Sequence, residues 1–213
     1  LDRYQIHRLL RQFGAQKLAQ DPTAEQTARD QHCAYYCAAL EEWDKGLKGV
    51  GQIETLAELE QDSTNARSAW YYAVNNEKLS ELDRAADGLF RFYLWRRRFH
   101  EGESAASLAE KMLSSYSEKE EIVPGVKRLL ARIQTWRSFF VKREKAQNLV
   151  REALETLNSP QLAALDTRRD RAFALQRAGD LAFDDDGQEA RHLFQQSLDL
   201  FRDLGDDWRT AKQ

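Results

Sequence analysis

The chain has 213 residues, of which 42% are hydrophobic and 31% charged, and its formal net charge is −3. Three prolines and ten glycines are too few for the many turns of an all-β sandwich, and the apolar content is too high for a disordered chain. The longest unbroken apolar run, residues 33–40, is far shorter than the roughly 20 residues of a membrane span.

Charge and cysteine content limit the function classes further. The chain carries no basic excess, which argues against a domain that grips nucleic acid by its phosphates. Cys33 and Cys37 are the only cysteines, and no signal peptide is visible. These features favour a cytoplasmic protein over a secreted disulfide scaffold, and we expect no membrane contact.

Apolar residues recur at helical spacing through almost the whole chain, which predicts an all-α fold. Residues 3–8 alternate weakly and are compatible with a short strand. The short helix that follows carries its apolar side chains on one face, at Leu9, Leu10, Phe13 and Leu18. Asp21 and Pro22 are typical of a helix start, and Gly46 suits the end of the same helix.

Further helices are predicted from the same periodicity along the rest of the chain. Their approximate ranges are 53–74, 79–99, 102–114, 123–143, 145–157, 160–178 and 188–203, with one more starting near Asp206. Ser159 and Pro160 predict the start of the helix over 160–178. The helical pattern still runs at Gln213, so we expect the chain to be a piece of a longer protein.

The C-terminal part contains an internal repeat with a period of 44 residues. Starting at Gly102, Ala146 and Ala190, three helices repeat the pattern small, apolar, apolar, small, apolar at offsets 0, +3, +4, +7 and +11. The preceding helix of each unit aligns at the same period. Because one helix pair cannot bury its apolar face alone, the pairs are predicted to stack into a solenoid or an elongated bundle.

The last unit resembles a tetratricopeptide repeat. Gly179, Ala190 and Phe194 match positions of that motif, whereas its paired aromatic residues are reduced to Ala182 and Phe183. The resemblance implies an antiparallel helix-pair solenoid whose first helices line a concave surface. The earlier units match the motif less closely.

Three segments also resemble parts of STAND-class signalling ATPases. Residues 4–18 look like the last strand and helix of the winged-helix domain in that family, and residues 65–74 and 92–103 are similar to segments of its sensor region. The resemblance implies a winged-helix remnant at 1–20, a linking helical hairpin at 21–77 and tetratricopeptide-like repeats at 78–213. It also implies ATPase domains upstream, with the repeats binding a protein, a peptide or a small-molecule inducer.

Candidate catalytic and metal-binding motifs are weak. The chain contains no G-x-x-x-x-G-K-[ST] phosphate loop and no G-x-S-x-G turn, and its four histidines form no motif, so we expect neither an enzyme nor a cofactor. Cys33 and Cys37 lie one helical turn apart next to His32, but two further metal ligands are missing, which favours buried packing residues. No metal site is predicted.

Two charged clusters have simple structural explanations. Residues 184–186 are three aspartates without the ligand spacing of a calcium loop, which favours a solvated turn that caps a helix. Residues 96–98 are three arginines in an acidic chain, and arginine is favoured at a helix C-terminus, so a nucleic-acid contact there is the weaker interpretation.

The tetratricopeptide register implies a candidate partner-binding surface. Carried onto this chain, the concave positions are Phe92, Trp95, Arg96, Arg132, Trp136, Phe139, Phe140, Gln176, Asp180, Phe183 and Asp184. Aromatic and arginine side chains anchor interfaces, and basic residues at one end with acidic residues at the other would orient a bound peptide or helix. The alternative is that these rings form the core between neighbouring units.

The resemblance therefore implies a non-catalytic sensor module that couples partner binding to an ATPase switch. Two other functions stay open at this point. One is a stand-alone scaffold that binds a peptide or helix, and the other, less favoured, is a nucleic-acid-binding helical repeat.

Overall fold

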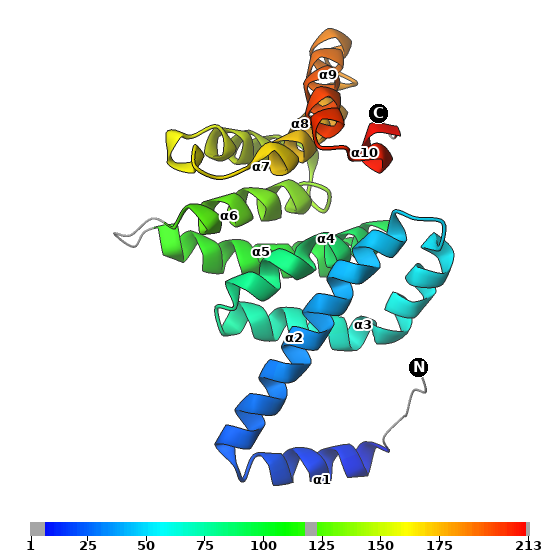
Figure 1. Ribbon diagram of the computed structural model, residues 1–213, viewed down its shortest axis with the longest axis vertical. Coiled ribbons are helices and arrows are strands. Elements are labelled where there is room, and N and C mark those ends of the chain that lie inside the picture. Colours follow the sequence, from blue (N-terminus) through cyan, green and yellow to red (C-terminus); the bar gives the residue numbers. More distant parts are fainter. Residues whose placement is uncertain (1–6, 118–122, 212–213) are drawn as a thin grey trace.

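The computed structural model describes residues 7–117 and 123–211, and every regular element in these ranges is helical (Figure 1). The elements are α1 (Arg8–Leu18), α2 (Pro22–Leu47), α3 (Gln52–Asn75), α4 (Leu79–Trp95), α5 (Phe99–Ser117), α6 (Pro124–Arg137), α7 (Arg143–Leu157), the short 3-10 helix η1 (Pro160–Leu162), α8 (Arg168–Ala182), α9 (Gly187–Asp203) and α10 (Asp207–Ala211). The expected all-α class is confirmed.

Consecutive helices pack on one another from one end of the molecule to the other (Figure 1). Helix α2 contacts both α3 and α4, and then α5 packs on α6, α6 on α7, α7 on α8, and α8 on α9. The alternate helices α4, α6 and α8 also contact one another in that order. The short α10 folds back against α9, so it lies near the surface that α4, α6 and α8 share.

The helix ends follow from local sequence. The carboxylate of Asp21 accepts a hydrogen bond from the backbone N–H of Ala24 at 3.0 Å, and Pro22 occupies the first turn, as predicted. Two residues after the last residue of α3, α4 and α9, the chain has a residue with positive φ, namely Glu77, Arg97 and Gly205. In each case the next residue donates its N–H to a carbonyl five residues back, which is the Schellman arrangement.

The 44-residue pattern predicts the buried faces of α5, α7 and α9 correctly. Their first repeat positions, Gly102, Ala146 and Ala190, are all buried. The positions seven residues later are fully buried in all three helices. At two sites the small residue is needed for contact with a ring, because a Cβ on Gly102 would lie 2.6 Å from the Phe140 ring and one on Gly179 would lie 2.6 Å from the Phe194 ring.

Several predicted helix bounds are wrong. The helix expected over 79–99 stops at Trp95, because Arg97 adopts the left-handed conformation and Phe99 starts α5. The helix expected over 123–143 stops at Arg137. The helix expected over 160–178 is instead η1 followed by α8, whose first N–H group, that of Arg168, donates to the Asp166 carboxylate at 3.1 Å.

The described part of the segment expected to be a winged-helix remnant packs little on the other helices. The expected strand falls mainly on residues 3–6, which lie outside the described residues, while His7 caps α1. Leu9, Leu10 and Phe13 are each more than half exposed. Helix α1 therefore does not bury its apolar face against the other described helices.

Candidate functional site

A cleft of about 160 Å³ lies between the C-terminal half of α4, the C-terminal end of α6 and helix α8, and residues of α9 and α10 complete its lining. We call it the inner cleft. Its lining comprises Arg91, Leu94, Trp95, Trp136, Phe139, Phe173, Gln176, Asp180, Phe194, Trp208 and Arg209. Five of these were predicted as partner-binding residues, namely Trp95, Trp136, Phe139, Gln176 and Asp180.

Aromatic rings in van der Waals contact form the wall of the inner cleft. The Trp136 ring centroid lies 4.7 Å from that of Phe173 and 5.7 Å from that of Phe139. Phe139 and Phe173 are stacked, with 5.9 Å between centroids and 11° between planes. Aromatic pairs of this kind contribute stabilising free energy in addition to that from burying their apolar area, so they stabilise the arrangement of the wall.

Arginine side chains lie over these rings. The Arg91 guanidinium is 5.4 Å from the Trp136 ring centroid, 5.9 Å from that of Trp95 and 4.9 Å from that of Trp208. Arg209 lies 4.5 Å from the centroid of Phe173. Cations over aromatic faces are stabilised by the ring quadrupole, and this stabilisation grows as water is excluded.

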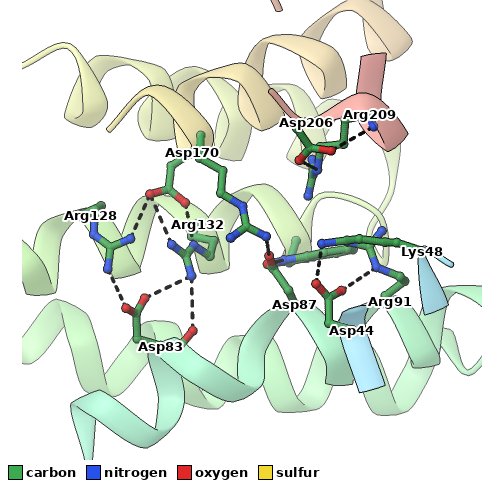
Figure 2. A network of polar contacts seen from close by, with 12 residues as sticks. Asp44, Lys48, Asp83, Asp87, Arg91, Arg128, Arg132, Asp170, Asp206 and Arg209 are labelled. Carbon is green, nitrogen blue, oxygen red and sulfur yellow. Dashed lines mark hydrogen bonds and ion pairs between the residues drawn. The ribbon is translucent and has the colours of Figure 1, made fainter. Parts of the chain in front are cut away.

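A buried ionic network supports the cleft from the α2 side (Figure 2). Arg91 Nε donates to the Asp44 carboxylate at 2.8 Å, and Lys48 also pairs with Asp44. Asp87 accepts hydrogen bonds from Trp136 Nε1 at 2.8 Å and from Arg169 at 3.2 Å. These contacts fix the indole of Trp136 and the guanidinium of Arg91 in the cleft wall.

A second part of the network joins α4, α6 and α8 (Figure 2). Arg132 Nε donates to Asp170 at 2.6 Å, and Arg128 bridges Asp170 at 3.1 Å and Asp83 at 2.6 Å. Arg132 also lies 3.1 Å from Asp83. The two arginines of α6 therefore hold one acid from α4 and one from α8, which sets the spacing of the three helices.

Burial and neighbouring charges shift the pKa values of this network. Burial alone would raise the pKa of Asp87, but Arg132, Arg169 and Arg209 hold it well below its usual range. Burial would lower the pKa of Arg132, but the carboxylates of Asp170 and Asp87 raise it above its usual value. For Arg209 burial prevails and lowers the pKa to about 10.

The structure places six of the predicted partner-binding residues outside the cleft. Phe92 is wrong as a groove residue because it is fully buried in the core. Phe140 fills the space beside Gly102, and Arg132 is held in the ion pairs described above. Phe183, at 66% exposure, lies on the outer face beside α9.

The charged ends predicted for the groove are also engaged elsewhere. Arg96 pairs with Glu60 of α3 at 2.9 Å, and Arg98 pairs with the same carboxylate, so two of the three clustered arginines are neutralised. Asp184 pairs with Arg143 of α7 at 3.2 Å. Of the four charged residues predicted to give the groove its polarity, Asp180 lines the inner cleft and Arg96, Arg132 and Asp184 do not, so the predicted polarity is not present there.

Sequence reasoning missed several cleft residues that have a recognisable signal. Arg91 precedes Trp95 by one helical turn, and Phe173 precedes Gln176 and Asp180 at offsets of three and seven residues, so each shares a helix face with a predicted residue. No helical spacing links Trp208 and Arg209 to a predicted cleft residue, because their position in the cleft depends on how α10 folds back on the other helices.

The remaining candidates have structural roles. Cys33 and Cys37 are fully buried with 3.9 Å between their sulfur atoms, and the described residues contain no group of three or more side chains arranged to hold a metal ion. Asp186 accepts hydrogen bonds from the N–H groups of Gln188 and Glu189 and so caps α9. This agrees with the packing and capping interpretations of the two clusters.

Within the described ranges, no helix combines the length and apolar character needed to cross a membrane. No family model, curated protein or solved structure matches the chain.

Proposed function

We propose that this chain is a non-catalytic binding and sensor module, a tetratricopeptide-like helix-pair solenoid that receives a partner at the inner cleft. The observation that carries the proposal is the convergence of aromatic and arginine side chains from α4, α6, α8 and α10 on one enclosed cleft. Residues of these types supply most of the binding energy in protein interfaces, because they bury a large area with few rotatable bonds.

The module is proposed to belong to a cytoplasmic STAND-type ATPase, where it would relay partner binding to the ATPase switch. Support comes from the sequence resemblance and from the way the cleft is built. Its lining spans residues 91–209, so a bound partner contacts the first helix of three successive hairpins at once. A ligand that binds better to one arrangement of these hairpins shifts the population toward it.

Selection of displayed peptides on the immobilised protein tests the binding function. Selected peptides should bind Trp95→Ala at least tenfold more weakly than the wild type, because the variant loses one wall of the cleft. Tyr35→Ala is the matched control, since Tyr35 is 60% exposed on α2 and does not line the cleft. Peptides that bind both variants as tightly as the wild type would contradict the proposal.

The complete reading frame tests the link to an ATPase. A G-x-x-x-x-G-K-[ST] loop encoded N-terminal to residue 1 is the expected result. A full-length protein without such a loop would favour a stand-alone scaffold.

A further inference from the structure

Arg209 is buried, and its guanidinium has no hydrogen-bond partner among the residues that the structure describes. The residue is 2% exposed, its Nε atom has no partner, and none of its side-chain nitrogens donates a hydrogen bond to any residue that the structure describes. Within the described part of the chain, its ion pair is with Asp206 at 3.8 Å. Its other contacts are the faces of Phe173 and Phe201, at 4.5 and 5.1 Å from the ring centroids.

A charged group in this setting is unfavourable unless an acceptor reaches it. Buried polar groups in native proteins nearly always have partners, and an exception points to a bound water, ion or ligand. Arg91, also in the cleft wall, has a second unpartnered buried atom, Nη2, although its Nε is paired with Asp44. Two guanidiniums with unused donors therefore belong to the lining of one cavity.

The neighbouring acids are shared with other cations, so they offset the charge of Arg209 only in part. Asp44 forms ion pairs with Arg91 and Lys48, and Asp87 pairs with Arg169 and accepts a hydrogen bond from Trp136. For Arg209, the attraction of Asp87 opposes the effect of burial on its pKa, whereas repulsion from Arg91 adds to that effect, and the contact with Asp206 is long at 3.8 Å. The charged side chains in the lining of the inner cleft are two arginines, Arg91 and Arg209, and one acid, Asp180, so the lining has an excess of positive charge.

Size and lining define the rest of the ligand. A cavity of about 160 Å³ is too small for a nucleotide and has room for one ring with a short side chain. Its apolar walls are the rings of Trp95, Trp136, Phe139, Phe173 and Trp208. The side-chain amide of Gln176 adds a donor, and the carboxylate of Asp180 disfavours a second negative charge on the ligand.

We propose that the inner cleft binds a small aromatic monocarboxylate, whose ring lies among the tryptophan and phenylalanine side chains and whose carboxylate accepts hydrogen bonds from Arg209 and Arg91. This inference rests on the proposed binding function and specifies the inducer as an organic acid. A carboxylate is favoured over a neutral acceptor because it supplies the missing counter-charge as well as the missing acceptor.

Titration calorimetry and tryptophan fluorescence with phenylacetate, phenylacetamide and inorganic phosphate test the inference, because three tryptophans line the cleft. Phenylacetate should bind at least tenfold more tightly than phenylacetamide, which has the same shape without the charge, and also more tightly than phosphate. Equal binding of the acid and the amide would overturn the carboxylate inference and leave an aromatic cleft, so the proposed function would survive. Phosphate binding as tightly as phenylacetate would also overturn it.

The variant Arg209→Met separates binding from structure. It should weaken phenylacetate binding at least tenfold while the melting temperature is unchanged or higher, because an unpaired buried charge is replaced by an apolar chain of similar length. Arg137→Met is the control, since Arg137 is paired with Glu103 and Glu110 at 2.6 Å and lies outside the cleft. It should lower the melting temperature and leave phenylacetate affinity intact. A large drop in melting temperature for Arg209→Met with unchanged affinity would assign Arg209 a purely structural role and refute the inference.

Discussion

Replacing Gly88 with alanine should strongly destabilise the protein, because α2 and α4 cross in direct backbone contact at this residue. A Cβ on Gly88 would lie 2.1 Å from the carbonyl oxygen of Leu40 and 2.9 Å from its carbonyl carbon. Both are backbone atoms, so no side-chain rotation relieves the clash. The two helices would have to separate by about 1 Å, taking the normal contact distance as about 3.2 Å.

The magnitude follows from two opposing effects. Alanine is favoured over glycine inside a helix by about 1 kcal/mol, whereas overpacking a closed interface costs typically about 1–3 kcal/mol and sometimes more. Because the clash is with backbone, we expect the overpacking cost to be about 3 kcal/mol or more, which leaves a net loss of about 2 kcal/mol or more in the free energy of unfolding. Urea denaturation followed by circular dichroism measures it.

Gly125→Ala is the matched control, because Gly125 also lies in a helix, α6, and its Cβ would meet nothing within 4 Å. This variant should be neutral or up to about 1 kcal/mol more stable. If Gly88→Ala behaved like Gly125→Ala, the close crossing of α2 and α4 would be refuted. The position of Arg91 and Asp87, which α4 carries into the ionic network, would then be in error as well.

Three further substitutions give graded tests of the cleft and its surroundings. Phe139→Ala should cost about 2 kcal/mol of stability, because Phe139 is only partly buried and lines the cleft, whereas Phe90→Ala, at a fully buried ring, should cost about 3–5 kcal/mol. Equal losses of the two variants in urea denaturation would place Phe139 wholly in the core. Asp87→Asn should cost about 3 kcal/mol at pH 7, because it removes a buried carboxylate whose charge offsets those of Arg132, Arg169 and Arg209. Folding lowers the pKa of Asp87, so its contribution to the free energy of unfolding is present above the unfolded-state pKa of about 4 and is lost as the pH falls. The difference in free energy of unfolding between the wild type and Asp87→Asn should therefore narrow by about 1.4 kcal/mol per pH unit below pH 4. A difference that stays constant down to pH 2 would argue against a charged Asp87. Arg97→Gly should raise the free energy of unfolding by about 0.5–1 kcal/mol in thermal unfolding, because Arg97 has a φ of 55°, in the left-handed region that favours glycine. Arg97→Ala should change the free energy of unfolding little. A gain of the same size in both variants would show that backbone strain is not the cause.

The helices and their buried faces were largely predictable because they depend on local periodicity. The repeat that begins at Gly102, Ala146 and Ala190 marks a face that must be covered in each unit, and the structure buries it in all three. The buried face of α2 is less clear from the sequence, since Tyr35 is exposed whereas the smaller Cys33 and Cys37 are fully buried. Aromatic and small residues alternate on that helix, so hydrophobicity alone does not choose the face.

The cleft was predictable only in part because the repeat register does not specify how far each ring is turned inward. Trp95, Phe139 and Phe183 occupy equivalent positions in sequence, yet the first two line the cleft and Phe183 lies outside it. Phe183 follows the end of α8, where the last helix pair has no further hairpin packed on it among the described residues. Contacts between distant helices, such as Arg91 over Trp208, cannot be read from spacing along the chain.

Nuclear magnetic resonance of the tryptophan indole N–H groups tests most directly whether the inner cleft is the binding surface. Trp95 and Trp208 line the cleft, whereas Trp43 lies outside it with its indole N–H donating to Glu58 at 3.2 Å. Titration with a peptide selected on this protein, or with phenylacetate, should shift the Trp95 and Trp208 signals and leave that of Trp43 unchanged. Saturable binding that shifts only Trp43, or none of the three, would contradict the assignment of the inner cleft.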